Sequence, residues 1–500
     1  MATARISKPA PKDLAKTLIS GALPGETDGF ARADKAAAAA IAQAALDNPK
    51  RPAIASETAT DARGRRIMRI AIANDDMPFL VDSVAATVAS HNIATNRILH
   101  PVVDTGTPTS LIYLETDRPD AKGRNALIAD IETNLGHVRA AVTDWRAMQT
   151  ALTAGAEQLG TSEGAALLAW LLDRNMTLLG SAHFDANGKI SKALGVAKRI
   201  GDALLSPEAR ERAMAWLGTH DGPLIVKSNF ISTVHRRAPL DLFIVKTDAG
   251  MTVHAGLWTS AALAAAPEDI PVLRARLAAM QGKYGFAPDG HAGKALAHAM
   301  TALPHDLLVS IHPEALENLA LTAMSLADRP RPELVLAEDA LDRHLFAFVW
   351  LPRDELTTAR RVAIGDMLAT AASARLLSWS IELGDGEVAL LRYTLDVREG
   401  GTIPPTAPLN QRIEAMYQGD KRGALLLVAL LWIAILFVLF MSWPYIPDAG
   451  VRVVVLVAAA AVLIFNTASI GAMLKHYKED KHFIYGIDIK HLDEARKHKG

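Results

Sequence analysis

The sequence predicts an α+β protein with three ferredoxin-like modules and helical connectors, followed by a two-helix transmembrane hairpin. Residues 66–145 suggest the order strand, helix, strand, strand, helix, which is that of a ferredoxin-like sandwich. Two later stretches, 176–312 and 333–395, again alternate short apolar strands with helices. Two uncharged apolar runs then lie near the C-terminus, and they predict the hairpin.

The composition narrows the class of protein. A chain of 500 residues has room for about three domains. Its 53 Lys and Arg residues balance 54 Asp and Glu residues, which argues against a nucleic-acid partner. It contains no cysteine, so disulfides, iron–sulfur clusters and thiolate zinc sites are excluded.

Residues 1–65 are expected to form a helical lead-in and a linker. The segment 34–47 is rich in alanine and has high helix propensity, whereas 52–65 is polar and begins with a proline. Residues 1–27 lack the apolar stretch of a signal peptide. We therefore expect the soluble part to stay in the cytoplasm.

The first module is expected over 66–150 and the second, with its helical connector, over 151–312. In the first, strands are expected from residue 66 and over 94–103 and 110–115, with helices over 79–91 and 121–145. In the second, strands are expected over 176–184, 224–226, 241–246 and 254–259, with a turn-like segment over 228–239 and helices over 163–173, 269–283 and 293–303.

The third module is expected over 313–400 and could be incomplete. Its strands are predicted over 334–336, 345–351, 375–382 and 388–395, around a helix over 357–371. A linker over 401–422 should lead to the hairpin.

The hairpin is predicted over 423–474. Residues 423–442 and 453–474 are uncharged and long enough to cross a bilayer, and the turn between them contains Pro444 and Pro447. Lysines and an arginine flank the outer ends, so the positive-inside rule places both ends, including the charged tail 475–500, in the cytoplasm. A buried hairpin in a globular core is the alternative. Polar groups that could bond between helices, or to a second chain, are Asn466, Thr467 and Ser469.

Several short motifs occur in one order along residues 30–395. They include NDDMPFLVDSV (74–84), HPVV (100–103), VRAAVTDWRAM (138–148), STVHR (232–236), GLWTSAAL (256–263), GHAGKAL (290–296), DRPR (328–331) and VWLPRDELTTARR (349–361). In these motifs the chain resembles the N-terminal region of the large bacterial NAD-specific glutamate dehydrogenases. The resemblance implies ACT-type modules, which are ferredoxin-like and commonly bind amino acids or assemble with other chains.

The resemblance also implies NAD and the conversion of L-glutamate to 2-oxoglutarate, in amino-acid catabolism. However, the sequence has no G-x-G-x-x-G, and its nearest glycine pair, Gly384 and Gly386, lacks the third glycine and is expected in a hairpin turn. A dinucleotide site needs a glycine turn between a strand and a helix N-terminus. No cofactor site, no catalytic residue and no metal site is therefore predicted in this chain.

The first candidate ligand site is the turn and helix start at 74–83. Free backbone N–H groups at a helix start favour a carboxylate, and acidic side chains could hold an ammonium group. The simpler alternative is that one of the first three residues only caps the helix, with Pro78 in its first turn. The candidate residues are Asn74, Asp75, Asp76, Met77, Pro78, Phe79, Asp82 and Ser83.

Two further segments have the same kind of chemistry. A basic, hydroxyl-rich patch could bind a carboxylate or phosphate, and its alternative is a solvated loop or an ion pair between modules. Its residues are Lys227, Ser232, Thr233, His235 and Arg236. The second segment comprises Arg353, Asp354, Thr357 and Thr358, where Asp354 or Thr357 as an N-cap is the alternative. Arginines 353, 360 and 361 could instead pair with acidic groups of another module.

The sequence thus favours a membrane-tethered module that senses an amino acid or serves in oligomerisation and has no catalytic site of its own. Its expected partners are an amino acid, a second copy of the chain or a catalytic glutamate dehydrogenase chain, and the membrane. The alternative is a subunit of an NAD-dependent glutamate dehydrogenase whose catalytic half lies on another chain.

Overall fold

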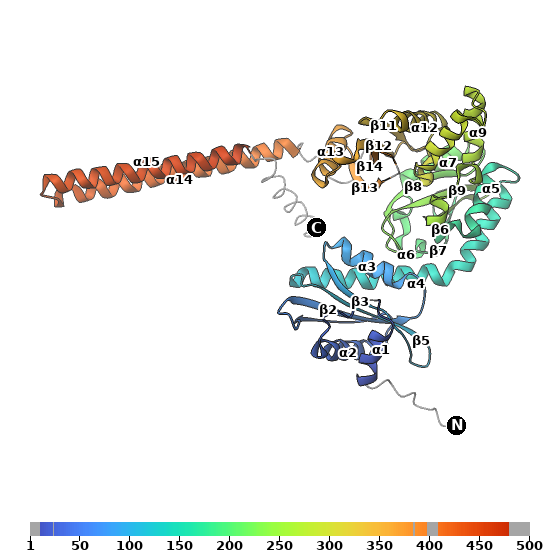
Figure 1. The fold of residues 1–500 in the computed structure, drawn as a ribbon, viewed down its shortest axis with the longest axis horizontal. Coiled ribbons are helices and arrows are strands. Elements are labelled where there is room, and N and C mark those ends of the chain that lie inside the picture. The colour runs from blue at the N-terminus through green and yellow to red at the C-terminus, as the bar shows by residue number, and fades with distance from the viewer. Residues whose placement is uncertain (1–10, 24, 384–385, 398–408, 480–500) are drawn as a thin grey trace. The chain divides into compact units, whose positions relative to one another are not determined.

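The computed structural model describes residues 11–23, 25–383, 386–397 and 409–479. It divides into two compact units at residue 398. The first unit holds three antiparallel sheets, and the second is a helical hairpin (Figure 1). Each unit is described separately below.

The first sheet has helices on both faces. Its strand order is β1-β2-β5-β3, with β4 also paired to β5. In Figure 1, α3 and α4 lie on one face and α1 and α2 on the other. The elements are α1 (Pro11–Ser20), α2 (Arg32–Asp47), β1 (Ala53–Thr60), β2 (Arg66–Asp75), α3 (Leu80–Ser90), β3 (Thr95–Leu99), β4 (Val102–Asp104), β5 (Pro108–Asp117) and α4 (Ala121–Gln158).

The apolar side chains of the central strands point alternately to the two faces of the sheet, which explains why helices cover both faces. On β2, Met68 and Ile70 belong to the core beneath α3 and α4, whereas Ala71 and Ala73 pack with α1 and α2. Because successive strand residues point to opposite faces, both sides of the strand are apolar. The small alanine side chains let the alanine-rich α2 lie close to the sheet.

The predicted linker over 52–65 is wrong in its first half, because Ala53–Thr60 forms β1. This strand pairs with β2 in register from Ala53 opposite Ala73 to Thr60 opposite Arg66. Its sequence, AIASETAT, is polar because it lies at the sheet edge and is largely exposed. The first module therefore begins before residue 66, and its lead-in helix α2 belongs to its core.

The expected boundary at residue 150 is also wrong, because α4 continues to Gln158. Residues 146–158 contain good helix formers and no proline, and the helix ends just before Gly160, whose φ is +65°. Buried Met148 and Leu152 pack with the second sheet's core. The first and second modules are thus joined by one continuous helix.

The second sheet is not ferredoxin-like, which corrects the prediction of three such modules. Its order is β7-β6-β10-β9-β8, and all neighbours are antiparallel. Short hairpins turn at Gly188 and Gly250, both with positive φ, where a ferredoxin-like unit would have helical crossovers. The strands are β6 (Met176–Asp185), β7 (Ile190–Gly195), β8 (Leu224–Ile231), β9 (Pro239–Thr247) and β10 (Gly250–Trp258).

Helices surround this sheet and lead on to the third one. The expected helix over 163–173 is α5 (Glu163–Trp170) followed by an irregular turn, Leu171–Asn175. The segment predicted as a turn over 228–239 is shorter, because β8 extends to Ile231. The remaining helices are α6 (Ala197–Ile200), α7 (Pro207–Leu217), α8 (Ser260–Leu263), α9 (Leu273–Tyr284), α10 (His291–Thr301), α11 (His305–Leu308) and α12 (Pro313–Asp328).

The third sheet repeats the topology of the first. Its order, β11-β12-β14-β13 with α13 between β12 and β13, corresponds to β1-β2-β5-β3 with α3. The predicted strands and helix of this module are confirmed, although the glycine turn at residues 384–385 lies outside the described residues. The elements are β11 (Glu333–Glu338), β12 (His344–Pro352), α13 (Thr358–Ala371), β13 (Arg375–Glu382) and β14 (Val388–Asp396).

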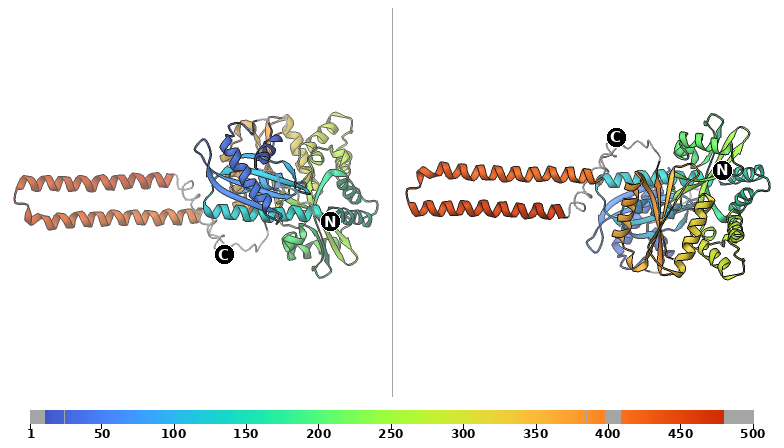
Figure 2. Two further views of the ribbon diagram at one scale, coloured as in Figure 1. Left: turned by 90° about the horizontal axis from the view of Figure 1, so that it is seen from below. Right: turned by 90° about the horizontal axis from the view of Figure 1, so that it is seen from above.

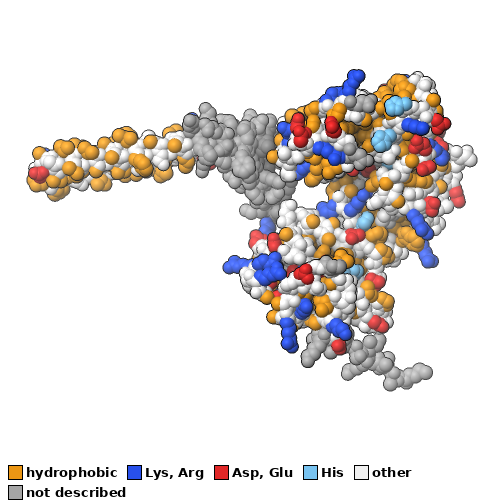
Figure 3. All heavy atoms as spheres, in the orientation of Figure 1, with side chains coloured by type: hydrophobic (Ala, Val, Ile, Leu, Met, Phe, Trp, Pro, Cys, Tyr) orange, Lys and Arg blue, Asp and Glu red, His pale blue; other side chains and the backbone are white. Residues whose placement is uncertain are grey.

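The second unit consists of α14 (Leu409–Ser442) and α15 (Ala449–Glu479), which lie side by side (Figure 2). Residues 417–445 and 449–474 are long and apolar enough to cross a membrane. Leu409 already belongs to α14, so the helix begins within the predicted linker. Hydrophobic side chains cover the visible face of the hairpin in Figure 3.

Between the two helices, the indole Nε1 of Trp432 donates to Thr467 Oγ1 at 3.1 Å, so one of the predicted polar contacts occurs within this hairpin. Asn466 instead donates to Val462 O of its own helix. The tail beyond residue 479 lies outside the described residues.

Candidate functional site

The predicted site at 74–83 does not cap α3 with a polar side chain. The N-cap position is held by Phe79, with φ +71° and no side-chain hydrogen bond. The side chains at the start of this segment bind α4 instead. The guanidinium of Arg139 donates to Asp75 Oδ2 at 2.6 Å and to Asn74 Oδ1 at 2.7 Å. Pro78 also precedes the helix rather than opening its first turn, so the capping interpretation is wrong.

The start of α3 contacts the second predicted segment instead. The backbone N–H of His235 donates to Ser83 Oγ at 2.9 Å, and His235 Nδ1 lies 3.0 Å from Asp82 Oδ2. The rings of Phe79 and His235 have centroids 5.5 Å apart. Two residues earlier in this loop, Thr233 Oγ1 lies 2.8 Å from Nδ1 of His137 on α4. Two segments predicted as separate sites therefore form one interface between the first and second modules.

A cavity of about 400 Å³ lies beside this interface. It is bounded by the segment before α3, by the middle of α4 and by the turn that leads into β6. Its lining consists of Pro78, Phe79, Ala141, Val142, Trp145, Gln149, Leu172, Arg174, Met176, Thr177 and Leu178. Only Pro78 and Phe79 among these belong to the residues predicted from sequence. Cavities of this size commonly hold small molecules.

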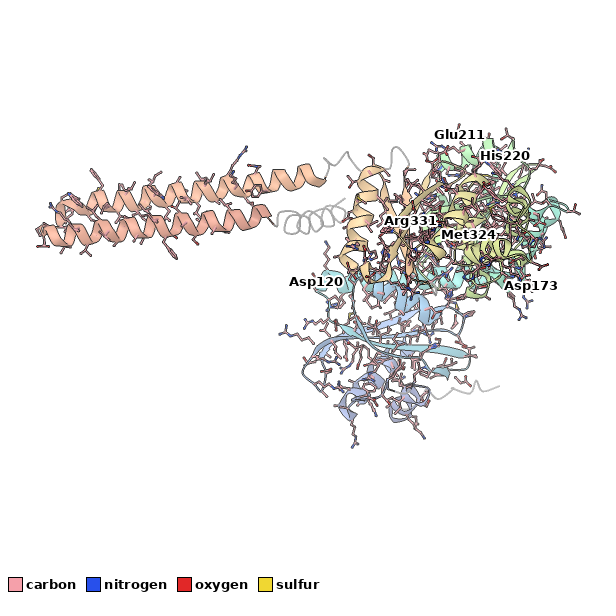
Figure 4. The ribbon with its side chains drawn as sticks, turned by 45° about the horizontal axis from the view of Figure 1, so that its top comes forward. Asp120, Asp173, Glu211, His220, Met324 and Arg331 are labelled. Atoms are coloured by element: carbon pink, nitrogen blue, oxygen red, sulfur yellow. The ribbon has the colours of Figure 1, made fainter. Side chains whose placement is uncertain are left out.

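The cavity has mainly apolar walls and a few polar groups at its edge. Phe79, Val142, Leu172 and Met176 supply apolar surface, and Trp145 is 48% exposed at its rim. Arg174 is exposed, and its guanidinium has no partner among the described residues. Asp173, the neighbour of Arg174, is labelled at the surface in Figure 4.

Two residues of the lining have unusual backbone conformations. Phe79 has φ +71°, and Arg174 has φ +62° and ψ +15° within the irregular turn that precedes β6. Left-handed conformations are uncommon for residues other than glycine, asparagine and aspartate, and they collect at binding sites. His235, whose ring contacts Phe79, also has a positive φ of +68°. Two residues with a positive φ thus line the cavity, and a third packs on one of them.

Lys227, assigned from sequence to a basic patch, lies apart from that patch in a buried network. Its Nζ contacts the carboxylates of Asp241 on β9 and Asp306 on α11. Arg392 of β14 also binds Asp306, at 3.3 Å, and Arg343 donates to the backbone carbonyl of Lys227 at 2.7 Å. These charges connect the second and third sheets.

The two carboxylates of this network differ in acidity. Burial raises the pKa of Asp241 to about 6, although the ammonium of Lys227 opposes that rise. Burial acts in the same direction on Asp306, but Lys227 and Arg392 outweigh it and hold the pKa of that carboxyl well below its usual range. At neutral pH these side chains are therefore charged and form ion pairs that join the second and third sheets.

The remaining basic residue of the patch, Arg236, donates to the backbone carbonyl of Trp258 at 2.9 Å. Ser232 closes its own loop, because its hydroxyl bonds the backbone of Val234. The expected anion-binding patch is thus divided between structural contacts, in agreement with the interpretation as a link between modules.

The third predicted segment caps a helix. Thr357 is the N-cap of α13, and its hydroxyl accepts the N–H of Arg360 at 3.1 Å. The backbone N–H of Arg353 donates to Glu387 O at 3.0 Å, and Arg360 pairs with Glu355 in the same module. Arg361 lies over the ring of Trp379, 3.7 Å from its centroid. The N-cap interpretation is confirmed, and Arg353, Asp354, Thr357 and Thr358 line neither of the two cavities described in this section.

A larger and more open hollow, of about 1100 Å³, lies between α5, α7, α9, α12 and β11. It opens beside Trp216 and His220, whose rings stack 4.3 Å apart, and His220 is labelled at the edge of the molecule in Figure 4. Some polar groups of its wall are engaged in structural contacts. Glu163 binds Arg274 at 2.9 Å and accepts the N–H of Val272, and Arg276 donates to the carbonyl of Ile311.

No group of three or more metal-ligating side chains occurs within the described part of the chain. Of the two cavities, the smaller one is lined in part by residues predicted from the sequence. Two sheets of one topology, joined by helices and a third sheet, define a protein built on ACT-like domains.

Comparison with known proteins identifies the type of protein. Models of the glutamate dehydrogenase ACT1 domain, helical motif 1 and ACT2 domain match residues 35–131, 270–329 and 333–418. The ACT1 match includes most of α2 and all of β1. The two ACT matches lie outside the second sheet, in agreement with its different topology.

The chain resembles the N-terminal region of NAD-specific glutamate dehydrogenases. It is 27% identical over 383 residues to the enzyme of Halomonas elongata, covering 65% of this chain and 23% of that protein. It is 26% identical over 378 residues to the enzyme of Pseudomonas aeruginosa, covering 66% and 23%. The Mycobacterium tuberculosis enzyme is 24% identical over 367 residues, covering 64% and 22%. The chain thus spans about a quarter of the length of the curated relatives it matches.

Proposed function

We propose that this chain is a membrane-tethered regulatory and assembly module of the glutamate dehydrogenase type. The observation that carries the proposal is the order of its parts, in which ACT1, helical motif and ACT2 regions are followed by two apolar helices. The regulatory role is supported by the ACT-like sheets and by the cavity beside the first of them. A second copy of the chain is the proposed assembly partner.

The hairpin supplies the tether. Its outer surface carries large apolar side chains, among them Phe437, Phe440 and Phe465, which are 61–76% exposed. A surface of this kind is stable in lipid and unfavourable in water. At the turn, Arg452 donates to Ile446 O at 2.7 Å and lies over the Trp443 ring, an arrangement suited to a membrane interface. We place both ends of the hairpin in the cytoplasm, at the inner membrane.

The natural absence of cysteine gives a direct test of this topology. A single cysteine at the turn, Asp448→Cys, should react with a membrane-impermeant maleimide in intact cells. A matched cysteine at the exposed Glu211, Glu211→Cys, should react only after lysis (Figure 4). Extraction at alkaline pH should leave both variants in the membrane pellet. Labelling of Glu211→Cys in intact cells, or release of the chain at alkaline pH, would contradict the proposed arrangement.

The alternative function is that of a subunit in an NAD-dependent glutamate dehydrogenase with its catalytic half on another chain. The name of the curated relatives favours it. NAD would then be bound by the other chain. Affinity purification of the full chain from its own cells, in detergent, tests this alternative. Co-purifying NAD-dependent glutamate oxidation would support it, whereas an inactive homo-oligomer would support the regulatory module.

A further inference from the structure

We infer that the cavity lined by Phe79, Trp145 and Arg174 binds a monocarboxylate with a short apolar chain, such as a branched-chain 2-oxo acid. It should reject the amino acid of the same carbon skeleton. The inference deepens the proposed regulatory function, on which it rests, because it names the class of ligand that the module would sense.

The walls of the cavity suit an apolar chain of a few carbons. Most of the lining side chains are hydrophobic, and they come from four segments: α4, β6, the irregular turn before β6 and the segment before α3. Ala141 and Leu178 are buried at 2% and 7% exposure, so the inner end is closed by the core. A volume of about 400 Å³ leaves room for a ligand of the size of an amino acid or 2-oxo acid.

The charge at the rim defines the polar end of the ligand. Arg174 is the sole charged residue of the lining, and its guanidinium has no partner among the described residues. A guanidinium presents a planar pair of donors that matches a carboxylate. Gln149 and Thr177 add an amide and a hydroxyl to the same lining, so a keto oxygen beside the carboxylate would find a donor.

The same lining has no carboxylate to pair with an ammonium group. No aspartate or glutamate lines the cavity. Three acidic side chains near the cavity pair with other residues: Asp75 with Arg139, Asp82 with His235, and Asp144 with Lys198. An ammonium placed against apolar walls without a carboxylate partner loses hydration and gains little. The cavity therefore distinguishes a 2-oxo acid from an amino acid by the group on the α-carbon.

The strained backbone is a second, independent observation at this cavity. Of the described non-glycine residues, seven have a positive φ, and two of these, Phe79 and Arg174, line this cavity. The left-handed conformation of Arg174 is held on both sides, because Asn175 donates to the carbonyls of Trp170 and Asp173. The left-handed backbone of Arg174 sets the direction in which its side chain leaves the turn. Such preorganisation is typical of binding sites.

Isothermal titration of the full chain in detergent tests the inference, with 4-methyl-2-oxopentanoate, L-leucine and 2-oxoglutarate as probes. We expect 4-methyl-2-oxopentanoate to bind at least tenfold more tightly than L-leucine, which adds an ammonium. We also expect at least a tenfold advantage over 2-oxoglutarate, which places a second carboxylate in the apolar part.

The matched variants are Arg174→Asn and Arg146→Gln. Asparagine tolerates the left-handed backbone, so Arg174→Asn removes the guanidinium while keeping the turn. It should weaken binding of 4-methyl-2-oxopentanoate at least tenfold without lowering the melting temperature. Arg146 is an exposed arginine of α4 that does not line the cavity, and Arg146→Gln should change binding less than twofold.

Three results would overturn the inference: equal binding of L-leucine, full binding by Arg174→Asn, or no binding of any probe at millimolar concentration. None of these results bears on the cysteine labelling of the hairpin. Failure of this inference is thus distinguishable from failure of the proposed membrane-tethered module.

Discussion

His235 and Asp82 lie 3.0 Å apart, Nδ1 to Oδ2, although 153 positions separate them in the chain. The loop before β9 thereby contacts the first turn of α3, and the adjacent backbone N–H of His235 donates to the buried hydroxyl of Ser83. This contact fixes the first module against the second. It also fixes Phe79, whose ring packs on His235 and whose side chain lines the cavity.

The two bonds at this interface should differ in strength. Ser83 is 1% exposed, so Ser83→Ala leaves the N–H of His235 without its acceptor and should cost about 1–2 kcal/mol. The side chains of Asp82 and His235 are 58% and 41% exposed, so Asp82→Asn should cost less than about 1 kcal/mol. Urea unfolding of the full chain in detergent compares the two variants, and a larger loss for Asp82→Asn would contradict this assignment.

Removal of Lys227 from its buried network should destabilise the junction of the second and third sheets. Lys227→Met leaves Asp241 and Asp306 without their shared ammonium, and removal of one member of a buried ion pair costs about 3–5 kcal/mol. Lys246→Met, at an exposed lysine of β9, is the matched control and should cost less than about 0.5 kcal/mol. Equal urea midpoints for both variants would show that the network contributes little.

Much of the fold could be predicted from periodicity. The third module's strands and helix, the helix α3 and the apolar helices were found because their apolar residues repeat at the spacing of one buried face or of a span. The polar edge strand β1 was missed, since an exposed edge lacks that repeat. The topology predicted for the second sheet was wrong. Its strand order depends on which strands pair in the folded protein, and local sequence patterns do not reveal that pairing.

The candidate site was predicted only in part. The segment at 74–83 was found because a turn before a helix is a frequent binding feature, and Pro78 and Phe79 do line the cavity. Leu172, Arg174 and Met176 were missed, because they reach the cavity through the packing of β6 beside α4. Trp145 lies within the motif 138–148 but was not predicted as a site residue. Its place as an aromatic residue on the exposed side of a long helix was the signal that could have indicated the cavity.

Stability should depend on pH through His254. This residue of β10 is fully buried, and burial lowers its pKa from 6.5 to about 4. The folded protein therefore binds this proton less readily than the unfolded chain. The contribution of neutral His254 is complete above about pH 6.5 and is lost as the pH falls toward 4. The shift corresponds to about 3 kcal/mol at the acidic end.

The variant His254→Leu removes this titration and tests its share of the acid sensitivity. Urea unfolding at pH 7 and pH 4.5 should show a smaller acid loss for His254→Leu than for the natural chain. His220→Gln, at an exposed histidine, should keep the full loss. If all three proteins lose the same free energy, His254 is not the group responsible.

Replacement of Arg174 by glycine should relieve backbone strain and raise the free energy of unfolding, although it removes the guanidinium proposed to bind the ligand. A left-handed residue other than glycine costs about 1–2 kcal/mol. Glycine removes that cost but adds about 0.5–1 kcal/mol of chain entropy in the unfolded state. Arg174→Gly, at φ +62°, should therefore gain about 0.5–1 kcal/mol in urea unfolding. Asp173→Gly, where φ is −81°, gains no such relief and should lower stability. A loss of stability in both variants would mean that the backbone at Arg174 is not strained. A gain at Arg174 alone would show that this turn holds its arginine in a strained conformation.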